Sequence, residues 1–366
     1  MKEYKNPVTL PPFTVKREVS TLSQNLGWQI TSTHINDVWG ITQGEGVKIC
    51  IIDTGCPITK KDGVFHVHPD LVSCIDVENS KTFVEYEGIE DLNGHSTHCC
   101  GIIGMQNNYI GGVGVAPKVT ITTYKALDAN GGGNIENITN ALKEALKHDF
   151  DIISMSLGCP VGDDIEHEII KQLYNKNVWL VGASGNDGIG RSVNYPAAYP
   201  EFFAIGAFDK HGNLADFSCG GPELLITAPG VAIYSTYLND TYAELSGTSM
   251  ATPGFAGTLA LLKSKHIKQQ KETGLNDCVT TEQAKEHIKK YATDKGIIGK
   301  DLYWGYGIVD IPKLIEAQEN GKPIIITPDE DPFSTVYNKK WYQKIKDWFW
   351  GAFVKPLPPP PPSYED

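Results

Sequence analysis

Short apolar runs alternate with amphipathic segments of helical period through the middle of this chain of 366 residues. Strands that are apolar on both faces and are joined by helices are typical of a parallel sheet covered on both sides. We therefore predict an α/β fold in which a doubly wound, mostly parallel sheet has helices on both faces. The predicted strands cover residues 47–52, 119–123, 151–155, 178–183 and 202–206, and the helices between them cover residues 94–104, 135–146 and 165–174.

Three polar residues come directly or shortly after predicted strands. Asp53 follows the first strand, Ser156 follows the third and Asn186 follows the fourth. Ligands of open parallel sheets bind beyond the carboxyl ends of the strands. We therefore expect these three residues to line one shared cleft.

The composition narrows the functions that the chain can have. Its formal net charge of -12 argues against nucleic acid as a main partner. No run of about 18 apolar residues occurs, so no transmembrane helix is expected. Residues 1–7 lack the apolar region of a signal peptide, and the eight cysteines are irregularly spaced, as in a protein kept reduced. We therefore expect a cytoplasmic location.

The two ends of the chain differ in character from its middle. Residues 1–25 are polar and contain prolines, and we interpret them as an extension to a domain of residues 26–320. We expect a linker of residues 321–338 to follow, and residues 339–366 to form a basic aromatic helix and a proline-rich tail. The helix is predicted to begin at Lys339 and to end at Val354. Such a helix can lie on a membrane surface, dock on a partner protein or dock on its own domain, and the pattern does not decide among these.

One serine is placed where a nucleophile is expected. Residues 246–254 predict a tight turn that leads into an apolar helix, with Ser249 at the helix N-terminus. The hydroxyl and the N–H of such a serine point to the same place, which suits nucleophilic attack with a built-in oxyanion donor. An ordinary N-cap serine is the alternative. Asp53 and His95 can serve as acid and base, and Asn186 can donate its amide to an oxyanion.

Five short motifs occur in one order along the chain. They are Asp-Thr-Gly at 53–55, His-x-Thr-His-x-x-Gly at 95–101, Ser-x-Ser-Leu-Gly at 154–158, Gly-Asn at 185–186 and Gly-Thr-Ser-Met-Ala-x-Pro at 247–253. In this order they resemble the subtilase family of serine peptidases. The resemblance extends over about residues 27–317, and the layout is most similar to that of intracellular subtilisins.

The resemblance implies a serine endopeptidase that hydrolyses peptide bonds through an acyl-enzyme. In it Asp53 is the triad acid, His95 the base and Ser249 the nucleophile, with Asn186 as the oxyanion donor. Polypeptides are the expected substrates, and they would pair as extended strands with two edges of the cleft. Those edges are formed by Gly131, Gly132 and Gly133 and by Ser156, Leu157 and Gly158.

A pocket for the residue before the scissile bond is also implied. Its walls would include Ala183, Gly185 and Asn194, with Asp187 at the rim. A single carboxylate at the rim does not make a pocket specific for basic residues. We therefore expect broad cleavage after apolar or medium-sized residues.

Residues 106–117 resemble the calcium loop of the same family. The implied ligands are the oxygen donors that calcium prefers, and a structural Ca2+ is expected. They are the Asp70 carboxylate, the Asn108 amide and the backbone carbonyls of Gln106, Ile110 and Gly112. A glycine-rich connector without a metal is the alternative.

Two other functions fit parts of the sequence. A zinc hydrolase could use His66, His68 and Asp70 together with His95 and His98, but it leaves Ser249 unexplained. A catalytically idle binding or structural protein on a peptidase fold is the second alternative.

Part of the extension is long enough to cross the cleft. Residues 8–15 are apolar and are held extended by Pro11 and Pro12. They loosely resemble the short Leu-Ile-Pro-Tyr inhibitory extension of intracellular subtilisins. We expect the two prolines to bend the segment over Ser249 so that no carbonyl lies in attack geometry. Residues 1–25 would then block the site until they are cut away.

Overall fold

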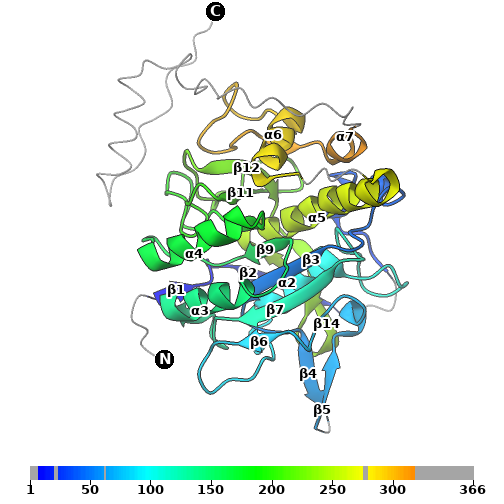
Figure 1. Ribbon diagram of the computed structural model, residues 1–366, viewed down its shortest axis with the longest axis vertical. Helices are drawn as coiled ribbons and strands as arrows, with labels where there is room; N and C mark the ends of the chain where they lie inside the picture. Colours follow the sequence, from blue (N-terminus) through cyan, green and yellow to red (C-terminus); the bar gives the residue numbers. More distant parts are fainter. Residues whose placement is uncertain (1–6, 20–23, 62, 275–278, 318–366) are drawn as a thin grey trace, which may run out of the picture.

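A central seven-stranded sheet organises the computed structural model, which describes residues 7–19, 24–61, 63–274 and 279–317 (Figure 1). All paired neighbours in this sheet run parallel. In spatial order the strands are β12 (Leu224–Pro229), β11 (Phe202–Phe208), β10 (Trp179–Ala183), β9 (Ile152–Met155), β3 (Lys48–Asp53), β7 (Thr120–Lys125) and β6 (Lys81–Thr82). The predicted α/β fold with a parallel sheet is confirmed.

The sheet changes its winding direction at β3. The chain passes from β3 to β7 on one side and then returns to β9 on the other side of β3. The crevice at such a switch point is where open α/β sheets bind ligands. Because Asp53 ends β3, the fold places this residue at the mouth of that crevice.

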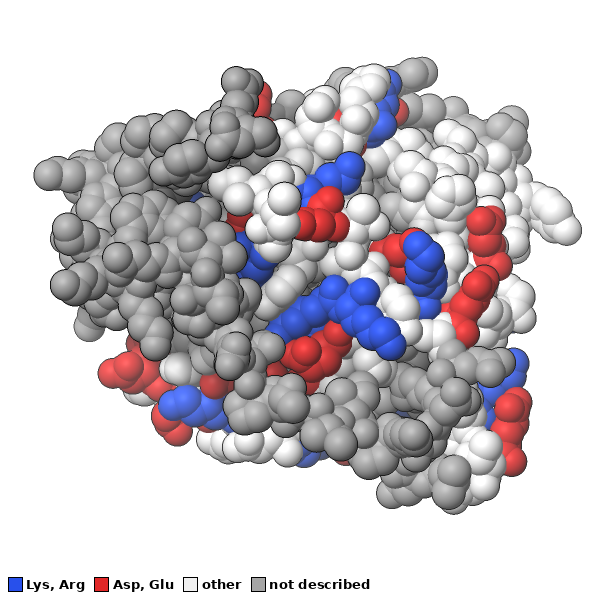
Figure 2. Space-filling view, turned by 90° about the horizontal axis from the view of Figure 1, so that it is seen from above, with Lys and Arg blue, Asp and Glu red and all other residues white. Residues whose placement is uncertain are grey.

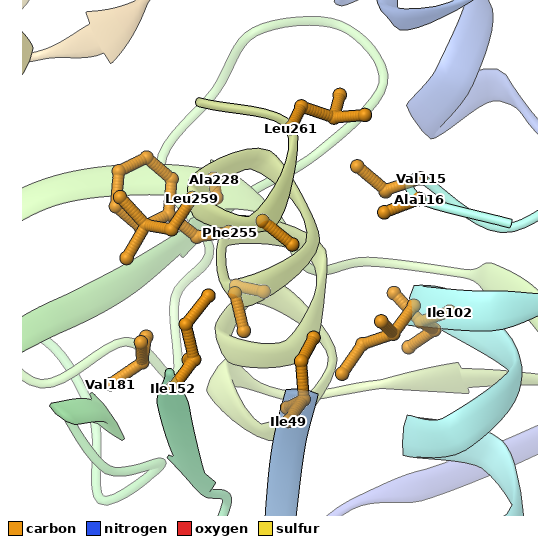
Figure 3. Packing of buried hydrophobic residues seen from close by; sticks show 14 of the residues in the cluster. Ile49, Ile102, Val115, Ala116, Ile152, Val181, Ala228, Phe255, Leu259 and Leu261 are labelled. Carbon is orange, nitrogen blue, oxygen red and sulfur yellow. The ribbon is translucent and has the colours of Figure 1, made fainter. Parts of the chain in front are cut away.

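Different helices cover the two faces of the sheet (Figure 1). α2 (His95–Gly104) and α5 (Thr248–Thr273) cover one face, and α3 (Ile135–Ala145) and α4 (Asp164–Asn175) cover the other. Along β3, Ile49 and Ile51 belong to the core on the α5 side, whereas Cys50 and Ile52 belong to the opposite core. The alternation follows from the two-residue period of a strand. Figure 3 shows Ile49 of β3 pointing toward α5 together with residues of β9 and β10.

The remaining elements form small sheets and short helices around this core. The strands are β1 (Pro7–Thr9) with β8 (Gly132–Asn134), β13 (Ile233–Tyr237) with β14 (Thr241–Ser246) and β2 (Thr14–Val19), the hairpin β4 (Ile58–Lys61) and β5 (Val64–Val67), and β15 (Ala292–Thr293) with β16 (Ile308–Val309). The helices are α1 (Trp28–Thr31), η1 (Ile35–Val38), η2 (Pro69–Leu71), η3 (Leu238–Asp240), α6 (Thr281–Tyr291) and α7 (Ile311–Glu316).

Charged side chains of both signs are interspersed on the described part of the face that Figure 2 shows. On α6, Lys285 pairs with Glu282 at 3.3 Å and Lys289 pairs with Glu286 at 2.6 Å. No helix within the described ranges is long and apolar enough to cross a membrane. The predicted linker at 321–338 and the predicted helix and tail at 339–366 lie outside the described residues.

A small cavity lies beside Gly254 in helix α5. It has a volume of about 30 Å³, and apolar side chains such as Ile102, Val115 and Phe255 contribute to its lining. A Cβ atom added at Gly254 would meet only Cγ2 of Ile102, at 3.7 Å, which is an ordinary contact. At Gly257 in the same helix, an added Cβ would lie 2.7 Å from Cβ of Val115. The two glycines therefore differ in the space that surrounds them.

We expect Gly254→Ala to raise the free energy of unfolding by about 1 kcal/mol. Alanine favours a helix interior over glycine by about that amount, and the added methyl group enters free space. Gly257→Ala is the matched control and is expected to lower stability, because its methyl group collides with Val115. Calorimetry on the Ser249→Ala background, where self-digestion is absent, measures both changes. A destabilised Gly254→Ala protein would contradict the prediction.

Candidate active site

A buried carboxylate and a buried imidazole meet at the end of β3. Nδ1 of His95 lies 2.9 and 3.0 Å from the two carboxylate oxygens of Asp53, and both side chains are fully buried. The N–H of Thr54 donates to Oδ1 of Asp53 at 2.7 Å. Burial opposes the charged imidazolium, but the Asp53 carboxylate outweighs it and raises the pKa of His95 well above its ordinary value. The pair therefore suits a base that accepts a proton and is stabilised once charged.

Ser249 lies in the first turn of α5, where the backbone N–H groups of a helix have no partner within the helix. Its hydroxyl donates to the carbonyl of Ser156 at 3.3 Å. Nε2 of His95 has no hydrogen-bond partner among the described residues. The serine and the histidine therefore do not form a nucleophile–base hydrogen bond in this structure.

Asn186 is held as an oxyanion donor by its own neighbours. Its Oδ1 accepts from the N–H and the hydroxyl of Thr248, at 2.9 and 2.8 Å. These bonds determine the direction of the amide, whose Nδ2 donates to the carbonyl of Pro12 at 2.7 Å. Because Thr248 immediately precedes Ser249, donor and nucleophile are positioned by the same helix end.

The chain's own residues 7–13 lie along both edges that were expected to pair with a substrate. β1 pairs antiparallel with β8, and Val8 and Thr9 lie opposite Gly133 and Gly132. The N–H of Leu10 donates to the carbonyl of Gly131 at 3.1 Å. On the other edge, Thr9 and Gly158 exchange backbone hydrogen bonds of 3.3 and 3.1 Å.

The two other residues of the second edge have different surroundings. Oγ of Ser156 donates to the carbonyl of Ser249 at 3.0 Å, and Leu157 is fully buried in the core beside α3 and α4. Ser156 therefore holds the nucleophile turn.

The segment continues past the catalytic residues. The ring of Phe13 lies 5.0 Å from the ring of His95, measured between centroids. The chain then enters β2, which pairs antiparallel with β14, so that Thr14 lies opposite Ser246.

The Pro12 carbonyl accepts a hydrogen bond from the side-chain amide of Asn186. The Ser249 hydroxyl points elsewhere, toward the carbonyl of Ser156. That no carbonyl of the segment lies in attack geometry stays a prediction.

Asn194 lies between the two walls of the expected specificity pocket. A Cβ at Gly185 would lie 2.5 Å from Nδ2 of Asn194, and one at Gly158 would lie 3.0 Å from its Cβ. Nδ2 of Asn194 donates to the Asp187 carboxylate at 3.0 Å. Ala183 is buried at the end of β10.

A thiol that the sequence analysis overlooked lies behind this pocket. The N–H of Asp187 donates to Sγ of Cys219 at 3.3 Å, and burial raises the pKa of the Cys219 thiol to about 12. No local motif around Cys219 indicated this position, since its contact to Asp187 spans 32 residues.

Three carbonyl oxygens of the expected calcium loop converge on one side chain. The side-chain amide of Gln24 lies 2.9, 3.2 and 3.5 Å from the carbonyl oxygens of Gln106, Gly112 and Ile110. Oδ2 of the buried Asp70 accepts from the N–H of Gly112 at 3.0 Å, but its Oδ1 has no partner among the described residues. Burial accordingly raises the pKa of Asp70.

The loop's remaining expected ligand is Asn108, whose Oδ1 accepts from the N–H of Ile110 at 3.1 Å. Gln24 is the residue that sequence reasoning missed. Its partners lie 82 to 88 residues away, so no pattern near residue 24 could have indicated it.

The residues of the zinc alternative are not gathered in one place. Nε2 of His68 lies 3.0 Å from the carbonyl of Thr241, and Nε2 of His98 lies 3.0 Å from that of Ile233. Within the described part of the chain, the His, Cys, Asp and Glu groups close enough to share a metal are Asp53, His95 and Cys99. These belong to the serine site.

A serine at a helix N-terminus, a histidine paired with a buried carboxylate and an amide donor lie beside an edge that pairs with a β-strand. This arrangement is typical of a serine hydrolase for extended peptides. A family model described as the subtilase family matches residues 44–307. The chain belongs to the subtilase family and is a subtilisin-type serine endopeptidase. This agrees with the function expected from the five motifs, and the catalytically idle alternative is not favoured.

Similar proteins are peptidases from bacteria. The chain is 37% identical over 285 residues to the minor extracellular protease Epr of Bacillus subtilis, a match that covers 77% of this chain and 40% of Epr. It is 38% identical over 272 residues to subtilisin Savinase of Lederbergia lenta, covering 74% and 91% of the two chains. It is 36% identical over 296 residues to an alkaline protease of Alkalihalobacillus alcalophilus, covering 80% and 70%.

The chemistry follows from these positions. When the Ser249 hydroxyl turns from Ser156 to Nε2 of His95, the imidazole can take its proton as Oγ attacks a substrate carbonyl. Asp53 accepts the hydrogen bond from Nδ1–H of His95, which leaves Nε2 free to take the proton, and it stabilises the imidazolium that forms. The imidazolium then protonates the leaving amine. The Asn186 amide can donate to the oxyanion that forms. In the second half of the reaction, His95 takes a proton from water as the water attacks the acyl-enzyme, and it then gives that proton to Oγ of Ser249 as the ester bond breaks.

Proposed function

We propose that this endopeptidase cleaves extended polypeptides and that its own residues 7–19 inhibit it until they are removed. The hydrogen bond from Nδ2 of Asn186 to the Pro12 carbonyl carries the proposal. It places the segment on the oxyanion donor while β1 and β2 pair with β8 and β14 on either side. A substrate needs the same donor and the same edges, so it must compete with a segment that is covalently attached.

The bound segment is a poor substrate for local reasons. Proline has a restricted backbone and no N–H, so neither Pro11 nor Pro12 can donate to a cleft edge. The Ser249 hydroxyl is engaged with Ser156, and Phe13 lies over the ring of His95, which is fully buried. The segment therefore binds in the position of a substrate without engaging the nucleophile.

Deletion of residues 2–19 is expected to remove the lag from a peptide-hydrolysis progress curve and to raise the initial rate. This deletion spares Gln24, whose contacts belong to the loop at 106–112. Deletion of residues 2–6 is the matched control, because it ends before β1 and should keep the lag. Full-length Ser249→Ala should remain uncut unless active enzyme is added. If the longer deletion is no faster than full length from the first minute, the inhibitory role is wrong.

Specificity is proposed to be broad, with cleavage after apolar or medium-sized residues. Asn194 limits the depth of the pocket between Gly158 and Gly185, and it already donates to the Asp187 carboxylate. Because the exposed Asp187 carboxylate already accepts this hydrogen bond from Asn194, its attraction for a basic side chain is weaker. Digestion of a peptide library would test this, and a strict requirement for basic residues would overturn it.

We also propose a structural Ca2+ held by Asp70, Asn108 and the carbonyls of Gln106, Ile110 and Gly112, with Gln24 as a further ligand. The unpartnered Oδ1 of Asp70 supports this, because a buried carboxylate oxygen without a partner is costly and a cation would stabilise it. The carbonyls already converge on the Gln24 amide, and reversing that amide would bring its oxygen to the same point. Bound Ca2+ would fasten residue 24 to the loop.

Calcium removal is expected to lower the melting temperature by several degrees, because a ligand at about 100 times its Kd stabilises by about 2.7 kcal/mol. Asp70→Asn should abolish the difference between calcium and chelator, and Gln24→Ala should reduce it. Asp209→Asn is the control, since that carboxylate lies in a separate exposed turn. Scanning calorimetry with calcium and with chelator measures the melting temperatures of the Ser249→Ala protein and of its Asp70→Asn, Gln24→Ala and Asp209→Asn variants. Equal melting temperatures with calcium and with chelator would exclude the site.

A cytoplasmic site of action is likewise a proposal. It is supported by the seven cysteines of the described residues, all of which are free and six of which are buried. Cell fractionation would test it, and recovery of the protein from the medium alone would overturn it.

A further inference from the structure

A buried carboxylate links the segments that carry the triad acid and the triad base. Asp91 is only 3% exposed and lies in the loop before α2. Its two oxygens accept five hydrogen bonds from residues on both segments. We propose that Asp91 is a positioning residue that sets the relative placement of Asp53 and His95 and thereby sets kcat.

The first half of this link is the start of the catalytic helix. α2 begins at His95, and its N-cap residue Gly94 has no side chain that could cap the helix. Asp91 performs that task from outside, with Oδ1 accepting from the N–H of Gly94 at 2.9 Å and Oδ2 accepting from the N–H of Thr97 at 2.8 Å. The hydroxyl of Thr97 also donates to Oδ2, at 2.6 Å. These bonds satisfy otherwise unpaired N–H groups and place a negative charge at the positive end of the helix.

The second half of the link is the end of β3. The hydroxyl of Thr54 donates to Oδ1 of Asp91 at 2.9 Å and accepts from the N–H of Ser96 at 3.0 Å. The N–H of the same threonine donates to Oδ1 of Asp53 at 2.7 Å. Asp91 is thus bound to Thr54, whose N–H holds the triad acid Asp53. Through Gly94 and Thr97 it is also bound to the turn that carries the base.

The backbone around Asp91 leaves little room for movement. The N–H of Asp91 donates to the carbonyl of Cys56 at 2.8 Å. A Cβ atom at Gly55 would lie 2.7 Å from the carbonyl oxygen of Glu90 and 2.8 Å from the nitrogen of Asp91. The loop therefore lies directly against the end of β3, and the carboxylate is held from its backbone as well as from its oxygens.

This arrangement has a kinetic consequence. The 2.9 Å contact between Asp53 and His95 involves two residues 42 positions apart, so no local structure sets it. A misplacement of about 1 Å in a catalytic group can cost about 10²-fold in rate. Loss of the Asp91 link should therefore lower kcat, while the cleft edges that bind substrate keep KM nearly unchanged.

The test uses Asp91→Asn in the full chain after the lag has ended. Asparagine has the same size, but its NH2 group donates and accepts no hydrogen bond, so it cannot replace the oxygen that accepts from the N–H and the hydroxyl of Thr97. We expect kcat, per active site titrated with a fluorophosphonate, to fall by about 10- to 100-fold and KM to change by less than about twofold. Asp301→Asn is the matched control. Asp301 is also buried and accepts from backbone N–H groups, those of Ile297, Tyr303 and Trp304, but it lies outside the triad segments.

A second-site comparison separates positioning from general loss of structure. In an Asp53→Ala background the acid–base contact is already absent, so adding Asp91→Asn should lower the residual rate by less than about twofold. If Asp91 had a merely structural role, the fold-decreases in rate caused by Asp53→Ala and by Asp91→Asn would multiply in the double variant. That result would overturn the proposal, as would an unchanged kcat in the Asp91→Asn enzyme or an equal loss of kcat in the Asp301→Asn control.

Thr54 tests the same link if Asp91→Asn does not fold. Thr54→Val removes the hydroxyl that joins Asp91 to Ser96, and it should lower kcat at nearly constant KM. Thr54→Ser restores a hydroxyl at that place and should recover most of the lost rate. If valine and serine give the same kcat, the hydroxyl link has no kinetic role and the proposal fails.

Discussion

The buried contact between Asp53 and His95 is the constraint on which the rest of the active site depends. A carboxylate and an imidazole removed from water are costly unless each is partnered. Here each partner comes from a different part of the fold, Asp53 from the end of β3 and His95 from the first turn of α2. The sheet's switch point brings these ends together, and the nucleophile turn of α5 completes the group.

The second organising feature is the use of one set of backbone edges for two purposes. Strand β8 and Gly158 present backbone groups of a kind that can pair with an extended peptide. In this structure the chain's own residues 7–10 occupy them, and Pro12 occupies the oxyanion donor. An edge that recognises backbone accepts any extended segment. In the proposed function, specificity therefore comes from the pocket around Asn194 and control comes from the attached segment.

Some of these features could be predicted from local sequence and others could not. The apolar strands and the helix starts at His95 and Ser249 depend on residues close together in the chain, and their patterns indicated them. The contact of Gln24 with the loop at 106–112 and the position of Cys219 behind Asp187 depend on pairs far apart in the chain, which carry no local pattern. Which carbonyl of the extension reaches Asn186 could not be predicted for the same reason, because it depends on strand register.

The sequence by itself determined the class of fold, the order of the catalytic motifs and the identity of the groups that perform the chemistry. Periodicity and short motifs are local properties, and they are present in the chain before it folds. The tertiary structure alone decided which carbonyl lies on the oxyanion donor, where the Ser249 hydroxyl points and how Asp91 joins acid to base. These depend on distances between segments that only the packed sheet and helices set, since each hydrogen bond requires its two atoms to lie within about 3 Å.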